Sequence, residues 1–192
     1  GGRIPSVVRE KIEKLSGTGK KAVTIAVYGN RAYEDALLEM NDILTKCGFT
    51  VIASGAFVAQ HSMAPEVGAG RPDGEDEKEI HKFAETVKNS TAVENVQVPG
   101  NRLYKPEMNL PVAPISLPSC TKCGKCVTVC PTNAISVADG AVITDIEKCI
   151  LCMACTHICT EQARIRPLPL QQKTEQMLGA LKGVRNKNEV FL

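Results

Sequence analysis

The sequence has no tryptophan, few aromatic residues and no long apolar run. Aromatic side chains make up 4% of the 192 residues and apolar residues 43%, so a core can form without large aromatic anchors. No apolar run approaches the roughly 18 residues that a membrane span needs, so no membrane span is expected. The formal net charge is only +2, and the basic residues do not cluster, so a nucleic-acid partner is not expected either.

The sequence also lacks an initiator methionine and a signal-peptide pattern. It opens with GGRIPSVV, and we therefore expect a chain that is truncated at its N-terminus. Nine cysteines would suit secreted disulfides, but the number is odd and eight of them lie in two short clusters. This arrangement favours metal binding in a reducing compartment, and we expect a cytoplasmic protein.

The first ninety residues alternate between strand and helix patterns. Residues 6–15 predict a short helix that Ser6 caps, and the apolar run Ala22–Val27 predicts a strand buried on both faces. A helical period over residues 33–47 follows, and then an apolar strand over Thr50–Ala59. A further helix is indicated by Ile80, Phe83, Ala84 and Val87. This order predicts half of an open, parallel α/β sheet.

The remaining chain divides by composition. A stretch rich in Val, Pro and Asn reads as an extended linker, a cysteine-rich segment follows, and an apolar period near residues 170–182 predicts a final helix. We therefore expect four parts, which are residues 1–90, 91–118, 119–168 and 169–192.

The cysteine-rich segment contains one spacing twice. The run C-x2-C-x2-C-x3-C comprises Cys120, Cys123, Cys126 and Cys130. It returns as Cys149, Cys152, Cys155 and Cys159, each 29 residues later. Ala134 and Ala163 keep the same offset, which indicates an internal duplication of a cluster-binding unit.

This spacing suits two [4Fe-4S] clusters with exchanged ligands. Two-residue gaps let three thiolates of one loop reach one cluster, while the fourth cysteine is carried on to the other cluster. The expected ligand sets are Cys120, Cys123, Cys126 and Cys159 for one cluster, and Cys149, Cys152, Cys155 and Cys130 for the other. Zinc sites usually pair two shorter motifs across a longer loop, so zinc fits these runs poorly.

Residues 119–166 resemble a bacterial-type ferredoxin with two [4Fe-4S] clusters. Between the runs, Asp139-Gly140 predicts a two-residue hairpin turn. One departure is Thr160, which follows Cys159 where the family usually has proline. Because proline is not a ligand, we still expect both clusters. The resemblance implies an α+β ferredoxin domain that transfers single electrons. Lys122 and Lys125 beside the first run would steer an acidic partner or be ordinary surface lysines.

The stretch VYGNRAYEDALLEM resembles the C-terminal half of a flavodoxin. The loop that wraps the flavin ring in that family corresponds here to Tyr28, Gly29, Asn30, Arg31 and Tyr33, with Tyr33 at the ring-stacking position. The whole chain is similar to fused flavodoxin–ferredoxin proteins, which are typical of anaerobes. The resemblance implies a partial flavodoxin-like domain and FMN as a cofactor.

Two features of a complete flavodoxin are missing. The first three strands and the phosphate-binding loop have no counterpart, so FMN binding by this chain alone should be weak or absent. The strand Ala22–Val27 would then lie at an exposed apolar edge.

Two functions follow as expectations. In the first, the chain relays single electrons through two [4Fe-4S] clusters to or from FMN and a redox partner protein. In the second, a flavin-free docking domain presents the ferredoxin to a partner oxidoreductase. No catalytic constellation stands out, so an electron carrier is favoured over an enzyme with its own substrate.

Overall fold

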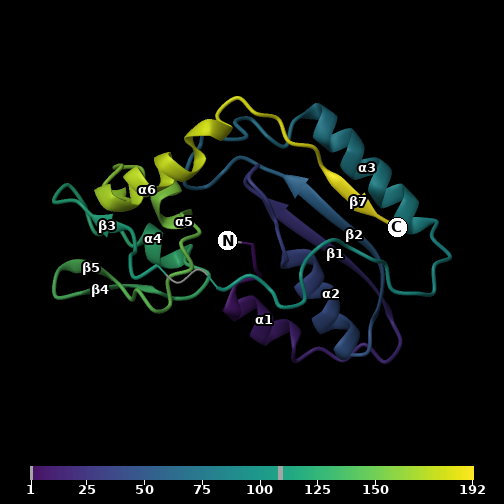
Figure 1. Ribbon diagram of the computed structural model, residues 1–192. Helices are drawn as coiled ribbons and strands as arrows, with labels where there is room; N and C mark the ends of the chain where they lie inside the picture. Colours follow the sequence, from purple (N-terminus) through teal and green to yellow (C-terminus); the bar gives the residue numbers. More distant parts are fainter. Residues whose placement is uncertain (1, 108–109) are drawn as a thin grey trace. The chain divides into compact units, whose positions relative to one another are not determined.

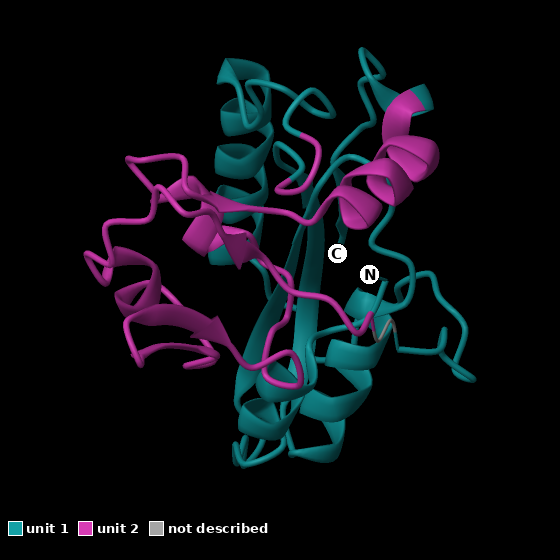
Figure 2. Ribbon diagram, turned by 90° about the vertical axis from the view of Figure 1, so that its left-hand side faces the viewer, with its two compact units in different colours: residues 1–61, 65–108, 180–192 teal, residues 62–64, 109–179 magenta. Residues whose placement is uncertain are grey.

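The computed structural model describes residues 2–107 and 110–192. The chain divides into two compact units (Figure 2). Unit 1 contains residues 1–61, 65–108 and 180–192, and unit 2 contains residues 62–64 and 109–179. The C-terminal tail thus belongs to the same unit as the N-terminal residues.

Unit 1 is built on a three-stranded sheet (Figure 1). Strand β1 (Lys21–Tyr28) and strand β2 (Thr50–Val58) are parallel, with helix α2 (Ala36–Lys46) between them in the chain. The predicted strand–helix–strand order is therefore confirmed. Strand β7 (Glu189–Phe191) pairs antiparallel with β2, so the sheet order is β1-β2-β7. The sequence pattern of this tail predicts no strand.

Two helices cover the sheet from opposite faces. On one face Leu37 of α2 packs with Tyr33 and Ala56 in a buried cluster. On the other face helix α3 (Gly74–Lys88) places Phe83 edge-on against Phe57, with ring centroids 5.6 Å apart. Helix α3 covers β2, which explains why β2 is buried along nearly its whole length.

Helix α3 begins earlier than its apolar period indicates. Its N-cap Asp73 accepts hydrogen bonds from the backbone nitrogens of Glu75 and Asp76. The Asp76 side chain accepts in return from the backbone nitrogen of Asp73, which completes a capping box. These polar interactions define the start of the helix, whereas the apolar residues mark only its middle and end.

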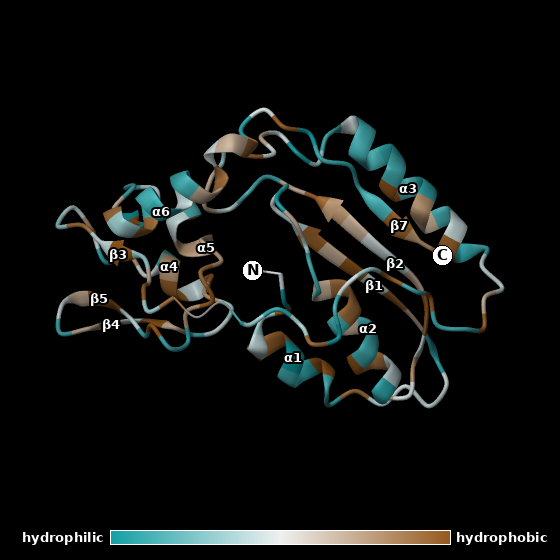
Figure 3. Cartoon of the chain, viewed as in Figure 1, coloured by the Kyte–Doolittle hydropathy of each residue, from teal (hydrophilic) through white to brown (hydrophobic). Residues whose placement is uncertain are grey.

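Strand β1 is not buried on both faces, and that prediction is wrong. Val23, Ile25 and Val27 are 38%, 50% and 69% exposed. Helix α3 lies over β2 rather than over this face of β1, whose other face carries the buried Thr24 toward α2. In the described residues β1 is an edge strand, and the brown colour in Figure 3 marks its hydrophobic residues.

Helix α1 (Ser6–Ile12) is shorter than predicted, and Ser6 does not cap it. The residue before it is Pro5, and no side chain caps the helix start. The segment that precedes α1 is held instead by Arg3, whose Nη2 lies 2.6 Å from Oε1 of the buried Glu39 on α2.

Part of the segment predicted as a linker is tied to unit 1. The carboxylate of Asp35, just before α2, accepts hydrogen bonds from the backbone nitrogens of Asn101 (2.8 Å) and Lys105 (2.6 Å). The side-chain oxygen of Asn95 accepts from the backbone nitrogen of Val51 at 2.7 Å. Residues 95–105 thus follow the surface of unit 1.

Unit 2 contains two short sheets and three helices. The helices are α4 (Lys125–Thr128), α5 (Ala154–His157) and α6 (Leu168–Leu178), with a 3-10 turn over Gly179–Leu181. The strands are β3 (Ile115–Ser116), which pairs with β6 (Arg164–Ile165), and β4 (Ile135–Ala138), which pairs with β5 (Ala141–Thr144). None of the helices in the described ranges combines the length and apolar character that crossing a bilayer requires.

The predicted hairpin turn is confirmed. Asp139 and Gly140 connect β4 to β5 with φ values of 50° and 72°. Positive φ at both central residues is the conformation that Asp-Gly sequences favour in two-residue hairpins. This hairpin joins the first cysteine run to the second.

Candidate metal centre

The two cysteine runs of unit 2 share their backbone conformation as well as their spacing. Lys122 and Gly124 in the first run have φ values of 59° and 79°, and Leu151 and Met153 in the second have 54° and 63°. Gly124 and Met153 each precede a four-residue helix, α4 or α5. Such left-handed residues in a loop turn backbone N–H groups toward one side and form concavities that bind anions.

Eight cysteines line two cavities in unit 2. The first cavity is lined by Cys120, Cys123, Cys126 and Cys159. The second cavity is lined by Cys130, Cys149, Cys152 and Cys155. Each cavity therefore combines three cysteines of one run with the last cysteine of the other run. These are the two sets that the spacing predicts, and their role as cluster ligands stays a prediction.

The cavity cysteines differ in how easily their thiols ionise. Burial raises the pKa of the Cys126 and Cys149 thiols. Burial acts on Cys130 in the same direction, but hydrogen bonds from Thr132 and from the Ala134 backbone lower the Cys130 pKa below its ordinary value. The Ala134 nitrogen lies 3.2 Å from the Cys130 sulfur. Donors of this kind stabilise the thiolate, which is the form that binds metal.

The donor set of each cavity fits an iron–sulfur cluster. Four thiols around one cavity are the ligands that a [4Fe-4S] cluster requires, and none of the nine cysteines is in a disulfide. Across residues 2–107 and 110–192, no three His, Cys, Asp or Glu side chains converge as one metal ion would need. Thiols spread around a cavity suit a group that contains several irons.

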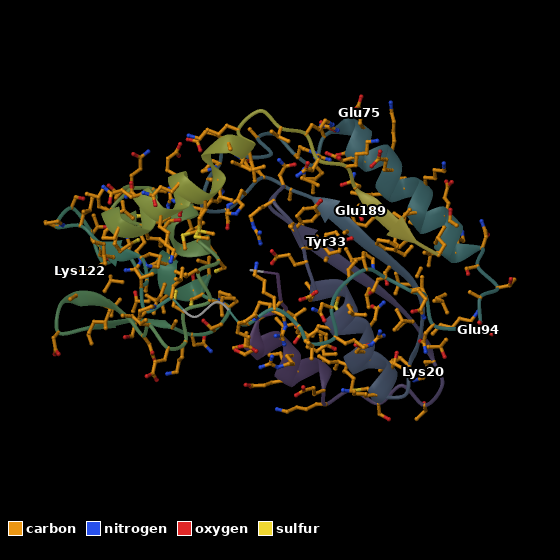
Figure 4. All side chains as sticks on the ribbon, viewed as in Figure 1. Lys20, Tyr33, Glu75, Glu94, Lys122 and Glu189 are labelled. Carbon is orange, nitrogen blue, oxygen red and sulfur yellow. The ribbon has the colours of Figure 1, made fainter. Side chains whose placement is uncertain are left out.

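The two cavities differ in charge. Four charged residues line the first cavity, which are Lys122, Lys125, Glu161 and Arg164. Of these, only Arg164 is buried, with 4% of its surface exposed. The second cavity is lined by cysteines and by apolar or hydroxyl residues, with no charged side chain among the described residues that line it. Figure 4 labels Lys122 as a guide to the charged cavity.

The residues predicted to bind flavin lie at the carboxyl end of β1 in unit 1. Tyr28, Arg31 and Tyr33 line a cavity of about 440 Å³, whereas Gly29 and Asn30 do not line it. Asn30 is fully buried, and its side chain bonds instead to the Val184 carbonyl oxygen at 2.8 Å. Crevices at the carboxyl ends of parallel strands are the usual ligand sites of open α/β sheets.

Tyr33 lines this cavity, but most of its side chain is buried. Only 9% of its surface is exposed, and its hydroxyl donates to Glu189 Oε2 at 2.8 Å (Figure 4). Its ring meets Tyr28 edge-on, with centroids 5.4 Å apart. Burial, reinforced by the Glu189 carboxylate, raises the Tyr33 pKa above its ordinary value. The more exposed Tyr28 and Arg31 are the predicted residues that a ligand would reach first.

Sequence reasoning missed several residues that line the unit 1 cavity. Asn186, Lys187 and Glu189 come from the C-terminal tail, and Pro99 and Gly100 come from the segment predicted as a linker. The tail residues lie at this cavity because β7 pairs with β2, and no local pattern in the polar tail indicates that pairing.

Comparisons with known proteins concern the cysteine-rich part of the chain. Residues 119–164 match a family model described as a 4Fe-4S dicluster domain. An alignment 65 residues long is 34% identical to an uncharacterized ferredoxin-like protein of Haemophilus influenzae, and it covers 31% of this chain and 76% of that protein. An alignment 45 residues long is 49% identical to the polyferredoxin-like subunit of an aliphatic sulfonate oxidoreductase of Pyrococcus furiosus, and it covers 21% of this chain. The match spans 26% of the length of the Pyrococcus protein.

The cysteine-lined cavities and these matches define an iron–sulfur protein of the [4Fe-4S] type. Within that class, the chain belongs to the ferredoxin-like proteins, and residues 119–164 form a domain of the type that carries electrons.

Proposed function

We propose that unit 2 binds two [4Fe-4S] clusters and relays single electrons between them. The cluster ligands are the four cysteines of the first cavity and the four of the second. Each cluster, when bound, accepts and releases one electron. The protein's part is to hold the thiolates, to supply backbone N–H groups near the sulfurs and to limit the access of water, which together set the potentials.

One observation carries this proposal. Cys159 lines the cavity of the first run, and Cys130 lines the cavity of the second run. The exchange of these last cysteines gives each cavity four thiols, and it links the two runs into one module. An arrangement of this kind has a clear purpose only if both cavities are filled, because each run alone supplies three ligands to its own cavity.

We further propose that residues 1–90 form a partial flavodoxin-like domain, that residues 91–118 connect it to the ferredoxin domain at 119–168, and that residues 169–192 form a C-terminal helix and tail. In this proposal FMN binds in the unit 1 cavity beside Tyr28 and Arg31. FMN exchanges two electrons and each cluster one, so the fusion would divide an electron pair into single steps. The cavity volume of about 440 Å³ lies within the range of small-molecule sites.

The test is anaerobic iron and sulfide analysis with a visible spectrum, before and after FMN is added. About eight irons per chain and the broad absorption of cubane clusters are expected. Bound FMN is expected to lose its fluorescence. Fewer than about eight irons after reconstitution would contradict the two-cluster proposal. Eight irons with free, fluorescent FMN would contradict only the flavin proposal.

A matched pair of variants makes the flavin test specific. Ala32 lines the unit 1 cavity, so Ala32→Phe would fill it and should abolish FMN quenching. Ala138→Phe makes the same change at an exposed position of the β4–β5 hairpin and should leave quenching intact. Equal quenching by both variants would show that FMN does not use this cavity.

A second candidate function is favoured by the exposed strip on β1. Val23, Ile25 and Val27 form an apolar face that a partner oxidoreductase would cover, with unit 1 acting as a flavin-free docking domain. The Pyrococcus relative is named as a subunit of an oxidoreductase, which fits a ferredoxin that serves a larger enzyme. Loss of partner-dependent turnover in Ile25→Glu, with eight irons retained and no FMN binding, would support this candidate over the first.

A further inference from the structure

The two cysteine runs differ at one buried position. Ile135 follows Ala134 after the first run, and Arg164 follows Ala163 at the same offset after the second run. Ile135 is 6% exposed and Arg164 is 4% exposed, so both side chains are buried. Each begins a strand, β4 or β6. One half of the duplication thus carries an apolar residue where the other half carries a cation.

The folded chain leaves the charge of Arg164 without an ionic partner. Its Nη1 donates to Ser116 Oγ at 3.0 Å, and its Nη2 donates to Thr144 Oγ1. Its Nε is buried and has no hydrogen-bond partner within the described part of the chain. Among those residues no carboxylate pairs with it. A buried charge without a counter-charge destabilises a fold, so this arrangement calls for an anion that the described residues do not supply.

Arg164 belongs to one cavity and not to the other. It lines the first cavity together with Cys120, Cys126 and Cys159. The hydroxyl of Thr144 accepts a hydrogen bond from Nη2 of Arg164. Thr144 lines the second cavity, but Arg164 itself does not.

Arg164 is the buried cation among the described residues that line the first cavity, with 4% of its surface exposed. The other cations of the first cavity, Lys122 and Lys125, are exposed, so solvent and salt screen them.

We infer that Arg164 is the counter-charge of the cluster in the first cavity, and that it raises the reduction potential of that cluster above that of its neighbour. This inference rests on the proposed pair of clusters. Reduction adds one negative charge to a cluster that is already anionic with four thiolates. A buried cation stabilises the reduced form more than the oxidised form, because Coulomb interactions are strong where water is excluded.

The consequence concerns where a single electron resides. An electron from an external donor enters the module and oxidises that donor by one electron, with no proton required. With Arg164 beside it, a cluster held in the first cavity would be the better acceptor. The second cavity has the apolar Ile135 at the equivalent position, so a cluster held there would give up its electron more readily. The module therefore has a built-in direction, from the second cavity to the first.

The test is an EPR-monitored redox titration of the cluster-loaded full chain, with dithionite as reductant. Arg164→Met should lower one of the two potentials and leave the other nearly unchanged. The equilibrium constant for electron distribution should change at least tenfold, which for one electron corresponds to about 59 mV. NMR signals of the cysteine β-protons, assigned on Cys126 and Cys155, identify which cluster is reduced first.

Three control variants separate charge from packing. Arg164→Lys keeps the cation and should keep most of the separation between the potentials. Ile135→Met changes one apolar side chain for another at the equivalent position and should change neither potential. Lys122→Gln removes an exposed cation from the same cavity, and its small shift should vanish at high salt.

The outcomes decide between this inference and the function on which it rests. Eight irons in Arg164→Met with both potentials unchanged would overturn the inference and leave the two-cluster function intact. An equal shift in Arg164→Lys would assign the effect to packing, which would also overturn it. If Arg164→Met fails to retain iron, Arg164→Gln provides the neutral side chain, with the same expected shift. Fewer than eight irons in the unaltered chain would contradict the proposed function itself.

Discussion

Each of the two units of the chain buries an arginine, and the two arginines differ in whether a carboxylate neutralises the charge. In unit 1 the guanidinium of Arg71 donates from Nε to Asp76 Oδ2 at 2.8 Å and from Nη2 to the other carboxylate oxygen. Its Nη1 donates to the Asn186 carbonyl oxygen at 2.5 Å. In unit 2, Arg164 has two hydroxyl acceptors and a buried Nε without a partner in the described residues.

The buried charge in unit 1 is neutralised by the protein itself, whereas the buried charge in unit 2 needs a bound cofactor to neutralise it. Asp76 neutralises Arg71 through a two-bond contact, so unit 1 needs no further anion there. Arg164 lines a cavity with four thiols, and the thiolates of a bound cluster are the natural source of its missing counter-charge. A buried cation beside a cysteine-lined cavity thus indicates both the cofactor and its electrostatic tuning.

The largest expected effect comes from removing one crossed ligand. Cys159→Ala should empty the first cavity and lower the iron content from about eight to about four per chain. Cys130→Ala should do the same for the second cavity. Iron and sulfide analysis after anaerobic reconstitution measures both. A variant at Cys47, which lies outside both cavities, should keep all eight irons and serves as the control. Full iron content in Cys159→Ala would contradict the ligand assignment.

Breaking the complete pair in unit 1 should have the next largest effect. Asp76→Asn leaves the buried Arg71 without its carboxylate, which typically costs about 3–5 kcal/mol of stability. Hydrogen exchange of the α3 amides in the cluster-loaded protein measures this loss within unit 1. Glu75→Gln makes the same chemical change one residue away, at a side chain that is 79% exposed, and should stay within about 0.5 kcal/mol. Equal losses in both variants would contradict the role of the Arg71–Asp76 pair.

Acid should weaken the same pair by a smaller amount. The hydrogen bonds from Arg71 hold the pKa of Asp76 well below its usual value of 3.8, although burial opposes this shift. Because the folded pKa is the lower one, the stabilisation is fully present above the unfolded value and is lost as pH falls toward the folded value. Protection of the α3 amides should therefore begin to decline below about pH 5 and continue to decline as the pH falls toward the folded pKa. Asp76→Asn should flatten this decline; parallel declines in both proteins would contradict it.

Local sequence signals predicted most of the candidate site. The spacing of the cysteines gave the two sets that line the cavities, because loop and short-helix geometry repeats wherever that spacing occurs. Asp139-Gly140 predicted its turn because both residues tolerate positive φ. The strands and helices of unit 1 followed from apolar periodicity, which depends on residues close together in the chain.

The features that were missed depend on contacts between distant residues. Strand β7 has three residues and is formed by its pairing with β2. No local sequence pattern predicts that pairing. The apolar run of β1 predicted burial on both faces, because such a run looks alike whether or not a neighbour covers it. The absence of neighbouring strands from the sequence predicted the exposed apolar edge that the structure shows. The burial of Arg164 depends on Ser116 and Thr144, and the only sequence signal for it is its alignment with Ile135 in the duplication.

The most direct measurement is an EPR-monitored redox titration of the two single-cluster proteins, Cys130→Ala and Cys159→Ala, each with and without Arg164→Met. The cluster that remains in Cys130→Ala lies in the first cavity, beside Arg164. We predict that Arg164→Met lowers the potential of this cluster and leaves the potential in Cys159→Ala nearly unchanged. Equal shifts in the two proteins, or a shift confined to Cys159→Ala, would contradict the crossed ligand sets and the role of Arg164 together.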